Sequence, residues 1–256
     1  VWTDHYGSTG GDNIDLVRAI EPSASFIEAA CKLLGKATVF ATNYQATHHK
    51  LKLPILPNAT AEEIAKGRAY LQSRAISPEV IQRAEACGMV RYAPDGVLFC
   101  GFDTLRRVRN VTRRASIQTA TVPKRDLKHS DKRYPPILHG NSSKVWLVEG
   151  GTDALALHEL AKRQGAPAPT VIVTGGAHVT NFLEMPHIQA LLRAAPSVTI
   201  AAENEKDAAT QAKTDAAHQN QAQLITAITG KPVTIWAPKP SQGKDIADMN
   251  ERRAKR

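Results

Sequence analysis

From residue 141 onward, short apolar runs alternate with stretches whose apolar positions recur at helical spacing. The runs are rich in Val, Ile and Thr and cover 144–148, 170–174, 198–202 and 233–236. Runs of this length are typical of buried strands, and the longer stretches between them are typical of helices. Because strand and helix alternate with short connections, residues 141–256 are predicted to form an α/β domain, with a parallel sheet and flanking helices.

Residues 58–140 have a different order of elements. A capping box at Thr60 and Glu63 predicts a helix to about Arg74, and a second helix is expected over 78–88. Strand-like runs then follow at 89–92, 97–102, 107–112 and 117–122. The first two flank a Pro-Asp-Gly turn, which is typical of a hairpin. This part of the chain is therefore predicted to be a smaller mixed α/β region that precedes the parallel sheet.

The amino-terminal part of the chain, 1–57, has helix signals in its first half and the composition of a linker in its second half. Helices are predicted to begin near Asp12 and Ser25, with Gly35 ending the second. Prolines and few helix signals mark the rest, which is predicted to be a linker.

Charge is distributed unevenly along the 256 residues, whose formal net charge is +9. Residues 106–133 hold ten Lys or Arg and two Asp. Such a stretch is typical of contact with a polyanion, usually nucleic acid, although a solvated basic loop has the same composition. The sequence has no apolar run of membrane-spanning length, no visible secretory signal and no CxxC pair. A cytoplasmic protein without membrane contact is therefore expected.

Acidic residues occur just beyond three of the predicted strands. They form three pairs, namely Glu149 with Asp153, Glu203 with Glu205, and Asp245 with Asp248. Parallel strands place their carboxyl ends at one edge of a sheet, so these acids are expected to share one cleft. Converging carboxylates repel one another unless a cation neutralises them, and Mg²⁺ prefers carboxylate oxygens. Such a site suits phosphoryl transfer, in which the cation polarises the phosphate.

One of these segments resembles a known motif. Val148-Glu149-Gly150, followed by Asp153 to Leu157, resembles the first motif of Toprim domains, in particular those of bacterial and plasmid primases of the DnaG-like type. The resemblance covers 141–250 well and the preceding part more loosely. It implies a Toprim domain at 141–256 and the amino-terminal part of a primase core at 58–140. Residues 1–57 resemble the end of a primase zinc-binding domain, without its metal ligands.

The resemblance also implies roles for individual residues. Its catalytic acids would be Glu149, Glu203, Glu205 and Asp245, and the metal ligands would be these four with Asp248. Nucleic acid or nucleotide would be bound by Arg107, Arg109, Arg113, Lys124, Arg125, Lys128, Lys132, Arg133 and Tyr134. Lys132-Arg133-Tyr134 resembles a basic-aromatic segment along the template groove, where cations neutralise phosphates and an aromatic ring stacks on a base.

The acids after the third strand depart from the family pattern. Toprim domains usually have Asp-x-Asp there, whereas this chain has Glu203-x-Glu205. The extra methylene displaces each carboxylate by roughly 1.5 Å, which matters at an octahedral Mg²⁺ site. Two interpretations remain open: Asp207 substitutes as a ligand, or Lys206 takes the place of a cation in a degenerate site. Asp153 is interpreted either as a member of the acidic set or as a cap of the first helix.

These observations favour a DNA primase of plasmid or mobile-element type. It would join ribonucleoside triphosphates into short RNA primers on a single-stranded DNA template, with Mg²⁺ or Mn²⁺ as cofactor. Further partners would be a helicase, a relaxase or another replication protein. Two alternatives remain open at this point. One is a Toprim nuclease, and the other is a DNA-binding accessory module of a mobilisation or replication protein that has no catalytic activity.

Overall fold

The computed structural model describes residues 51–116 and 123–255, together with 2–3, 10–11, 16–17, 20, 29 and 33. The chain divides into two compact units, Val1–Leu51 and Lys52–Arg256. In the first, β1 (Trp2–Thr3) pairs antiparallel with β2 (Gly10–Gly11). The helices predicted from Asp12 and Ser25 fall largely outside the described residues, and the strand predicted at 117–122 lies wholly outside them.

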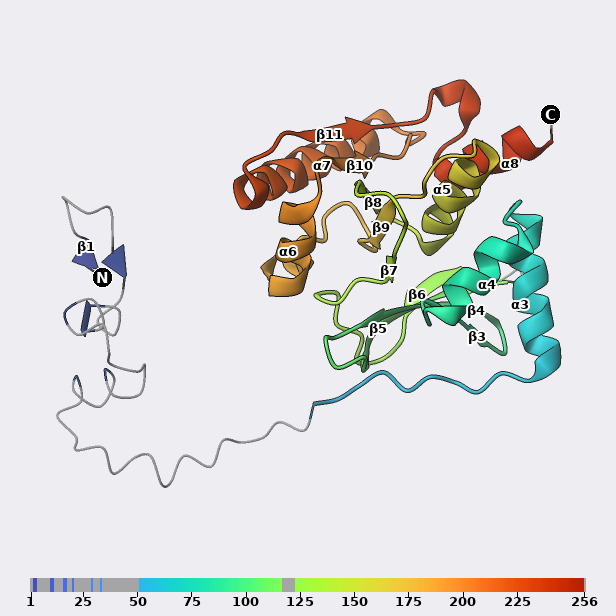
Figure 1. Ribbon diagram of the computed structural model, residues 1–256, viewed down its shortest axis with the longest axis horizontal. Helices are drawn as coiled ribbons and strands as arrows, with labels where there is room; N and C mark the ends of the chain where they lie inside the picture. Colours follow the sequence, from blue (N-terminus) through green and yellow to red (C-terminus); the bar gives the residue numbers. More distant parts are fainter. Residues whose placement is uncertain are drawn as a thin grey trace. The chain divides into compact units, whose positions relative to one another are not determined.

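A five-stranded sheet forms the centre of the second unit. Its strands are β7 (Ile137–Leu138), β8 (Val145–Val148), β9 (Thr170–Val173), β10 (Val198–Ala201) and β11 (Val233–Trp236). The spatial order is β11-β10-β8-β9-β7, and the first four strands in this order run parallel, while β7 is an antiparallel edge (Figure 1). The chain steps from β8 outward to β9 and then crosses back to β10, so the strand order reverses between β8 and β10.

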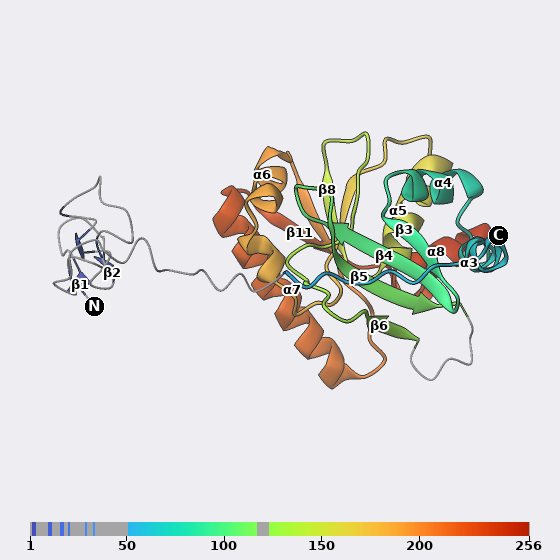
Figure 2. The same cartoon turned by 90° about the horizontal axis from the view of Figure 1, so that it is seen from below.

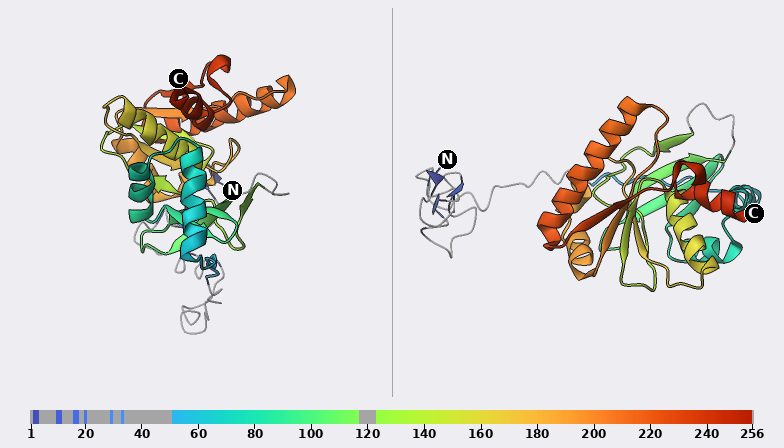
Figure 3. Two further views of the ribbon diagram at one scale, coloured as in Figure 1. Left: turned by 90° about the vertical axis from the view of Figure 1, so that its right-hand side faces the viewer. Right: turned by 90° about the horizontal axis from the view of Figure 1, so that it is seen from above.

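Helices cover both faces of this sheet. They are α5 (Gly151–Arg163), α6 (Pro186–Ala194), α7 (Ala208–Thr229) and α8 (Ile246–Ala254). Leu155 and Leu160 of α5 share one core with Val148, whereas Ile188 of α6 and Ile225 of α7 share another with other residues of the sheet. Figure 3 shows α7 on one side of the strands and α5 with α8 on the other. Two short 3₁₀ helices, η2 (Asn181–Glu184) and η3 (Pro240–Gln242), lie in the connections.

The preceding region supplies two helices and a second sheet. The helices are α3 (Ala61–Ser73) and α4 (Pro78–Ala86), and the strands are β3 (Val90–Ala93), β4 (Gly96–Phe102), β5 (Val108–Ala115) and β6 (Lys124–Asp126). All neighbouring strands pair antiparallel in the order β3-β4-β5-β6 (Figure 2). The Thr60–Glu63 capping box is present, as predicted.

One hydrophobic core joins this region to the parallel sheet. Leu71 of α3, Ile81 of α4 and Phe99 of β4 belong to the same cluster of buried side chains as Leu155 of α5. The two regions approach closely at Gly151, where an added Cβ would overlap the ring of Phe99. The antiparallel sheet therefore packs directly against the first turn of α5, and this contact places its strands beside the carboxyl end of β8.

The α/β class and the parallel strands are confirmed, whereas two strands and one α-helix of the second unit were not predicted. Strand β7 has only two residues, too few for a periodic pattern, and it makes the sheet mixed rather than wholly parallel. Strand β6 lies in the basic stretch, whose exposed Lys-Arg-Asp sequence has no apolar alternation. Helix α8 follows Asp245 and contains many charged residues. Within the described residues, no helix is both long and apolar enough to cross a membrane.

Candidate active site

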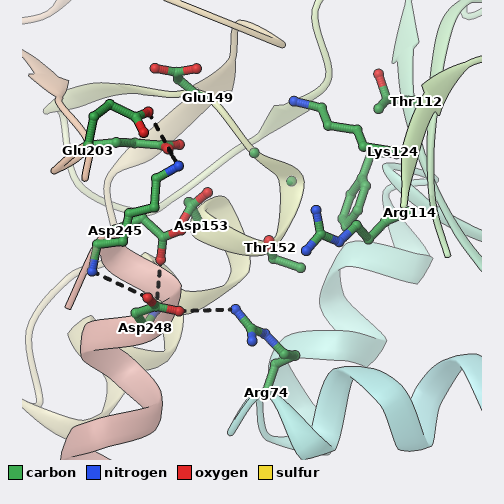
Figure 4. A pocket seen from close by; sticks show the side chains of 15 residues that line it. Arg74, Thr112, Arg114, Lys124, Glu149, Thr152, Asp153, Glu203, Asp245 and Asp248 are labelled. Atoms are coloured by element: carbon green, nitrogen blue, oxygen red, sulfur yellow. Dashed lines mark hydrogen bonds and ion pairs between the residues drawn. The ribbon is translucent and has the colours of Figure 1, made fainter. Parts of the chain in front are cut away.

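A cavity of about 500 Å³ opens where the two sheets meet (Figure 4). Its wall is formed by acids from the parallel-sheet side and by bases from the antiparallel sheet and α3. The acids are Glu149, Asp153, Glu203, Glu205, Asp245 and Asp248. The bases of the second group are Arg74, Arg114 and Lys124; Lys244 lies among the acids, and Phe99, Thr112 and residues 150–152 complete the lining.

The strand order explains why these acids meet. Glu149 directly follows β8, and Glu203 follows β10 after one further residue. Strands β8 and β10 are neighbours, and the sheet reverses its order between them. In open α/β sheets this reversal leaves a crevice beyond the carboxyl ends of the strands, where ligands bind. Asp245 reaches the same crevice as the N-cap of α8. The three acids predicted to share one cleft do line one cavity.

Three carboxylates form the tightest part of the site. Single oxygens of Asp153, Glu203 and Asp245 all lie within 4.8 Å of one another. Among the described residues, no other trio of acids, histidines or cysteines comes together in this way. A set of carboxylate oxygens at this spacing fits a hard divalent ion such as Mg²⁺ or Mn²⁺. Glu149, which was also predicted to be a metal ligand, lies in the same cavity but outside this trio.

Asp153 does not cap α5, so this interpretation of its role is wrong. The cap position is Gly150, and no side chain caps this helix. Instead, Oδ1 of Asp153 accepts a hydrogen bond of 3.0 Å from the backbone N–H of Ala247 in α8. The carboxyl group is buried, and this burial together with the charges of Asp245 and Glu203 raises its pKa well above the usual range. An added Cβ at Gly150 would lie 2.5 Å from Oδ2 of Asp153.

The other two members of the trio, Glu203 and Asp245, also have raised pKa values. Burial and the charge of Glu149 raise the pKa of Glu203, despite the nearby Lys244 ammonium. Burial raises the pKa of Asp245, although its Oδ1 accepts the N–H of Asp248 at 2.7 Å. A raised pKa means that the folded protein disfavours the charged form. A divalent cation among these oxygens would relieve that cost, so the residues present fit such an ion.

Glu149 has a different partner from the trio. Its Oε1 lies 3.4 Å from Nε2 of His218, a residue of α7 that is 1% exposed. Burial by itself would raise the pKa of Glu149, but the hydrogen bond and charge of His218 and the charge of Lys124 lower it below the usual value. Glu149 therefore remains ionised at neutral pH while its neighbours in the trio resist ionisation.

A lysine lies among the acids, but it is Lys244 rather than Lys206. Nζ of Lys244 is 3.1 Å from Oε2 of Glu203 and 3.3 Å from Oε1 of Glu205. Lys206 is exposed and does not line the cavity. Asp207 does not line it either, since its carboxylate caps α7 through the N–H and hydroxyl of Thr210. The two interpretations that gave Lys206 or Asp207 a place in the site are therefore wrong.

Asp248 is turned toward the amino-terminal helices. Its Oδ1 lies 3.5 Å from a guanidinium nitrogen of Arg74, the C-cap residue of α3. Arg74 also pairs with Glu251 at 2.7 Å. Asp248 thus lines the cavity but lies outside the closest trio, and its charge is shared with an arginine.

Two of the basic residues predicted to bind nucleic acid are instead buried. Arg109 and Arg113 are 7% and 6% exposed. Arg109 pairs with Asp131 at 3.1 Å, and Arg113 pairs with Asp95. Their guanidinium groups are therefore held inside the protein, which corrects their predicted role. The sequence could not reveal this, because each aspartate partner is distant along the chain.

The remaining predicted basic residues differ in their surroundings. Lys124 and, from the same sheet, Arg114 point into the cavity opposite the acids (Figure 4). Arg107 pairs with Asp103 at 2.8 Å, Lys132 with Asp126 at 3.2 Å, and Arg133 with Asp131 at 2.8 Å. Arg125 and Lys128 are exposed. Acidic partners thus neutralise part of the positive charge of this stretch. The two basic residues of the stretch that line the cavity are Lys124 and Arg114.

Tyr134 is part of a column of planar groups. The Arg109 guanidinium lies 4.1 Å from the centroid of the Tyr134 ring, and the ring of His187 stacks on Tyr134 at 6.1 Å between centroids. Two protein groups therefore already lie against the ring that was predicted to stack on a base.

Besides Arg74, three charged or titratable residues of the site escaped the sequence analysis. Lys244 is adjacent to the predicted Asp245, and this adjacency was the available signal. Arg114 belongs to the basic stretch, where nothing in the sequence separates it from its neighbours. His218 lies in the middle of α7 with no motif around it, so only the packing of α7 against the sheet reveals it.

The solved structures that this chain resembles in fold include primase catalytic cores. The DnaG catalytic core matches with a TM-score of 0.51 and 17% identity, over 75% of this chain and 69% of that chain. The DnaG primase catalytic domain bound to ssDNA matches with a TM-score of 0.49 and 17% identity, over 84% of this chain and 73% of that chain. The E. coli primase catalytic core matches with a TM-score of 0.47 and 17% identity, over 74% of this chain and 69% of that chain. No protein-family model and no curated protein sequence matches this chain. The first match shows that the chain has the fold of a DnaG primase catalytic core, with its Toprim-type sheet.

Proposed function

We propose that this protein is a primase-type nucleotidyltransferase, which joins ribonucleotides on a single-stranded DNA template with Mg²⁺ or Mn²⁺. The observation that carries the proposal is the trio of Asp153, Glu203 and Asp245, which meets at the sheet reversal with basic side chains across the same cavity. Buried acids that repel one another are stabilised by a cation, and phosphoryl transfer needs such a cation beside its substrate.

Other residues that line the cavity suit the phosphates of a nucleotide. Lys124 and Arg114 line the cavity, as do Thr152 and the backbone of the first turn of α5. A helix N-terminus favours anions through its free N–H groups and its dipole. In the proposed reaction these groups would hold the triphosphate, and the trio would hold a divalent ion, which would supply the charge that polarises the transferred phosphate.

Glu149 is proposed to act on the attacking hydroxyl. It is ionised at neutral pH and fixed by the buried His218, and it lies at the end of β8 in the same cavity. An ionised carboxylate can accept the proton that leaves the hydroxyl when the oxygen attacks phosphorus. Glu205 is held by Lys244, and its proposed contribution is to position that lysine.

The test is a primer-synthesis assay with single-stranded template, labelled ribonucleoside triphosphates and Mg²⁺ or Mn²⁺. Short labelled products are expected from the wild type and should be lost in Asp245→Asn. The matched control is Asp207→Asn, which makes the same chemical change at a residue outside the cavity, where asparagine is also a good helix cap. Cleaved template without synthesis would favour a nuclease. Template binding with neither product would favour an accessory module.

A further inference from the structure

The positive charge between Glu203 and Glu205 is a side chain of the protein, the ammonium group of Lys244. Nζ of Lys244 lies 3.1 Å from one carboxylate and 3.3 Å from the other, so a single ammonium bridges the two acids. Burial would lower the pKa of Lys244, but these carboxylates raise it above its usual value, and the side chain is fully charged at neutral pH.

The backbone fixes the position from which Lys244 reaches the acids. The N–H of Asn204, the residue between the two glutamates, donates to the carbonyl of Lys244 at 2.8 Å. The Asn204 side-chain amide donates to the carbonyl oxygens of Gly243 and Pro238 at 3.1 and 2.8 Å. The loop after β10 is therefore tied to the loop before α8. These bonds hold the backbone of Lys244 beside the glutamates, so its partly exposed side chain extends from a fixed point.

The place taken by this ammonium is one that a second metal ion would need. Two-metal phosphoryl-transfer sites hold ions about 3.5–4 Å apart, bridged by shared carboxylates. Here Glu203 is shared between the trio and Lys244. A second divalent ion bound to Glu203 and Glu205 would lie against the ammonium, and the repulsion between the two cations would exclude it.

We propose that Lys244 replaces a second divalent cation, so that this site binds one metal ion, at Asp153, Glu203 and Asp245. The inference rests on the proposed function and specifies its metal requirement. Lys244 acts as a positioning residue: it holds Glu203 and Glu205 in place and supplies a fixed positive charge. The Glu-x-Glu pair fits this arrangement, because the added methylene groups let both carboxylates reach one ammonium.

The experiment measures Mn²⁺ binding, by electron paramagnetic resonance of free Mn²⁺ and by calorimetry, on metal-free protein. The wild type is expected to bind one Mn²⁺ per chain. Lys244→Met is expected to bind two, because the freed glutamates become ligands, whereas Lys244→Arg should still bind one. The control is Lys206→Met, which removes the same charge from the neighbouring exposed position and should leave the stoichiometry at one.

Two ions in the wild type, or one ion in both the wild type and Lys244→Met, would overturn the proposal. A second ion in Lys206→Met as well would also overturn it, because net charge rather than the position of Lys244 would then explain the gain. Protein without any Mn²⁺ binding would contradict both the one-metal site and the metal-dependent function. One bound Mn²⁺ with no primer synthesis would leave the role of Lys244 intact and reject only the proposed function.

Discussion

The carboxylate of Asp153 accepts a hydrogen bond from the backbone N–H of Ala247, 94 residues later in the chain. This contact joins the first turn of α5 to the first turn of α8. The positive ends of two helix dipoles therefore point at the trio of acids, which partly offsets the repulsion among the carboxylates. Because of this hydrogen bond, Asp153 links α5 to α8 as well as being a residue of the site.

Asp153→Asn is expected to stabilise the metal-free protein by roughly 1 kcal/mol, or about 2–4 °C in melting temperature. The asparagine oxygen can still accept the Ala247 N–H, while the buried charge is removed. The pKa of Asp153 is raised in the folded state, so the wild type loses stability as pH rises from the usual aspartate range toward the raised value. The advantage of the variant should thus grow with pH and vanish in acid. Thermal unfolding from pH 4 to 8 checks this, and an advantage that is constant with pH would contradict it.

Mg²⁺ or Mn²⁺ is expected to raise the melting temperature of the wild type, and a chelator should reverse the rise. An ion that binds only the folded state stabilises it by about 2.7 kcal/mol at 100 times its dissociation constant. Asp245→Asn should lose most of the effect, while Asp207→Asn should keep it. Differential scanning calorimetry with and without metal is the measurement. Equal metal-induced shifts in the two variants would remove the trio from the metal site.

Glu149→Gln is expected to reduce nucleotide transfer by about 10²–10⁴-fold, the usual range for losing a proton acceptor. The amide is nearly the same size and can still accept a hydrogen bond from His218, so the fold and DNA binding should be retained. Primer synthesis, melting temperature and template affinity are measured on the same variant. Synthesis at the wild-type rate would reject the catalytic role of Glu149.

Binding to single-stranded DNA is expected to weaken with salt through the cavity-facing cations. Each phosphate contact adds about −0.7 to the slope of log affinity against log salt. Lys124→Ala should therefore flatten the slope by about this amount. Arg133→Ala should change it less, because Arg133 is already paired with Asp131 at 2.8 Å. Fluorescence anisotropy over a salt series distinguishes the two, and equal slopes in both variants would contradict the assignment.

Gly151→Ala is expected to destabilise the protein by about 1–3 kcal/mol, the usual cost of overpacking. Its Cβ would overlap the ring of Phe99, so the antiparallel sheet and α5 would have to separate. Gly165→Ala is the control, since nothing lies within 4 Å of its added Cβ and only its positive φ of 62° opposes the change. Urea unfolding gives both values. A smaller loss at Gly151 than at Gly165 would show that the two sheets can separate at little cost.

Local patterns in the sequence were sufficient for most elements of the second unit. The apolar runs at β8, β9, β10 and β11 and the Thr60 capping box predict elements that the structure contains. These signals depend on neighbouring residues only, through side-chain periodicity and helix capping. The positions of Glu149, Glu203 and Asp245 beyond strands were likewise readable, because parallel strands bring their carboxyl ends to one edge.

The pairing of charges was decided by tertiary structure alone. Arg109 and Arg113 look like their exposed neighbours in the sequence, yet distant aspartates bury and neutralise them. Lys244 and His218 become partners of the site acids only when α7 and α8 pack on the sheet. Whether a charged side chain is free, paired or buried depends on distances of a few ångströms between remote segments. The sequence by itself determined which strands end in acids, and the packing of the two sheets and their helices decided which of those acids meet.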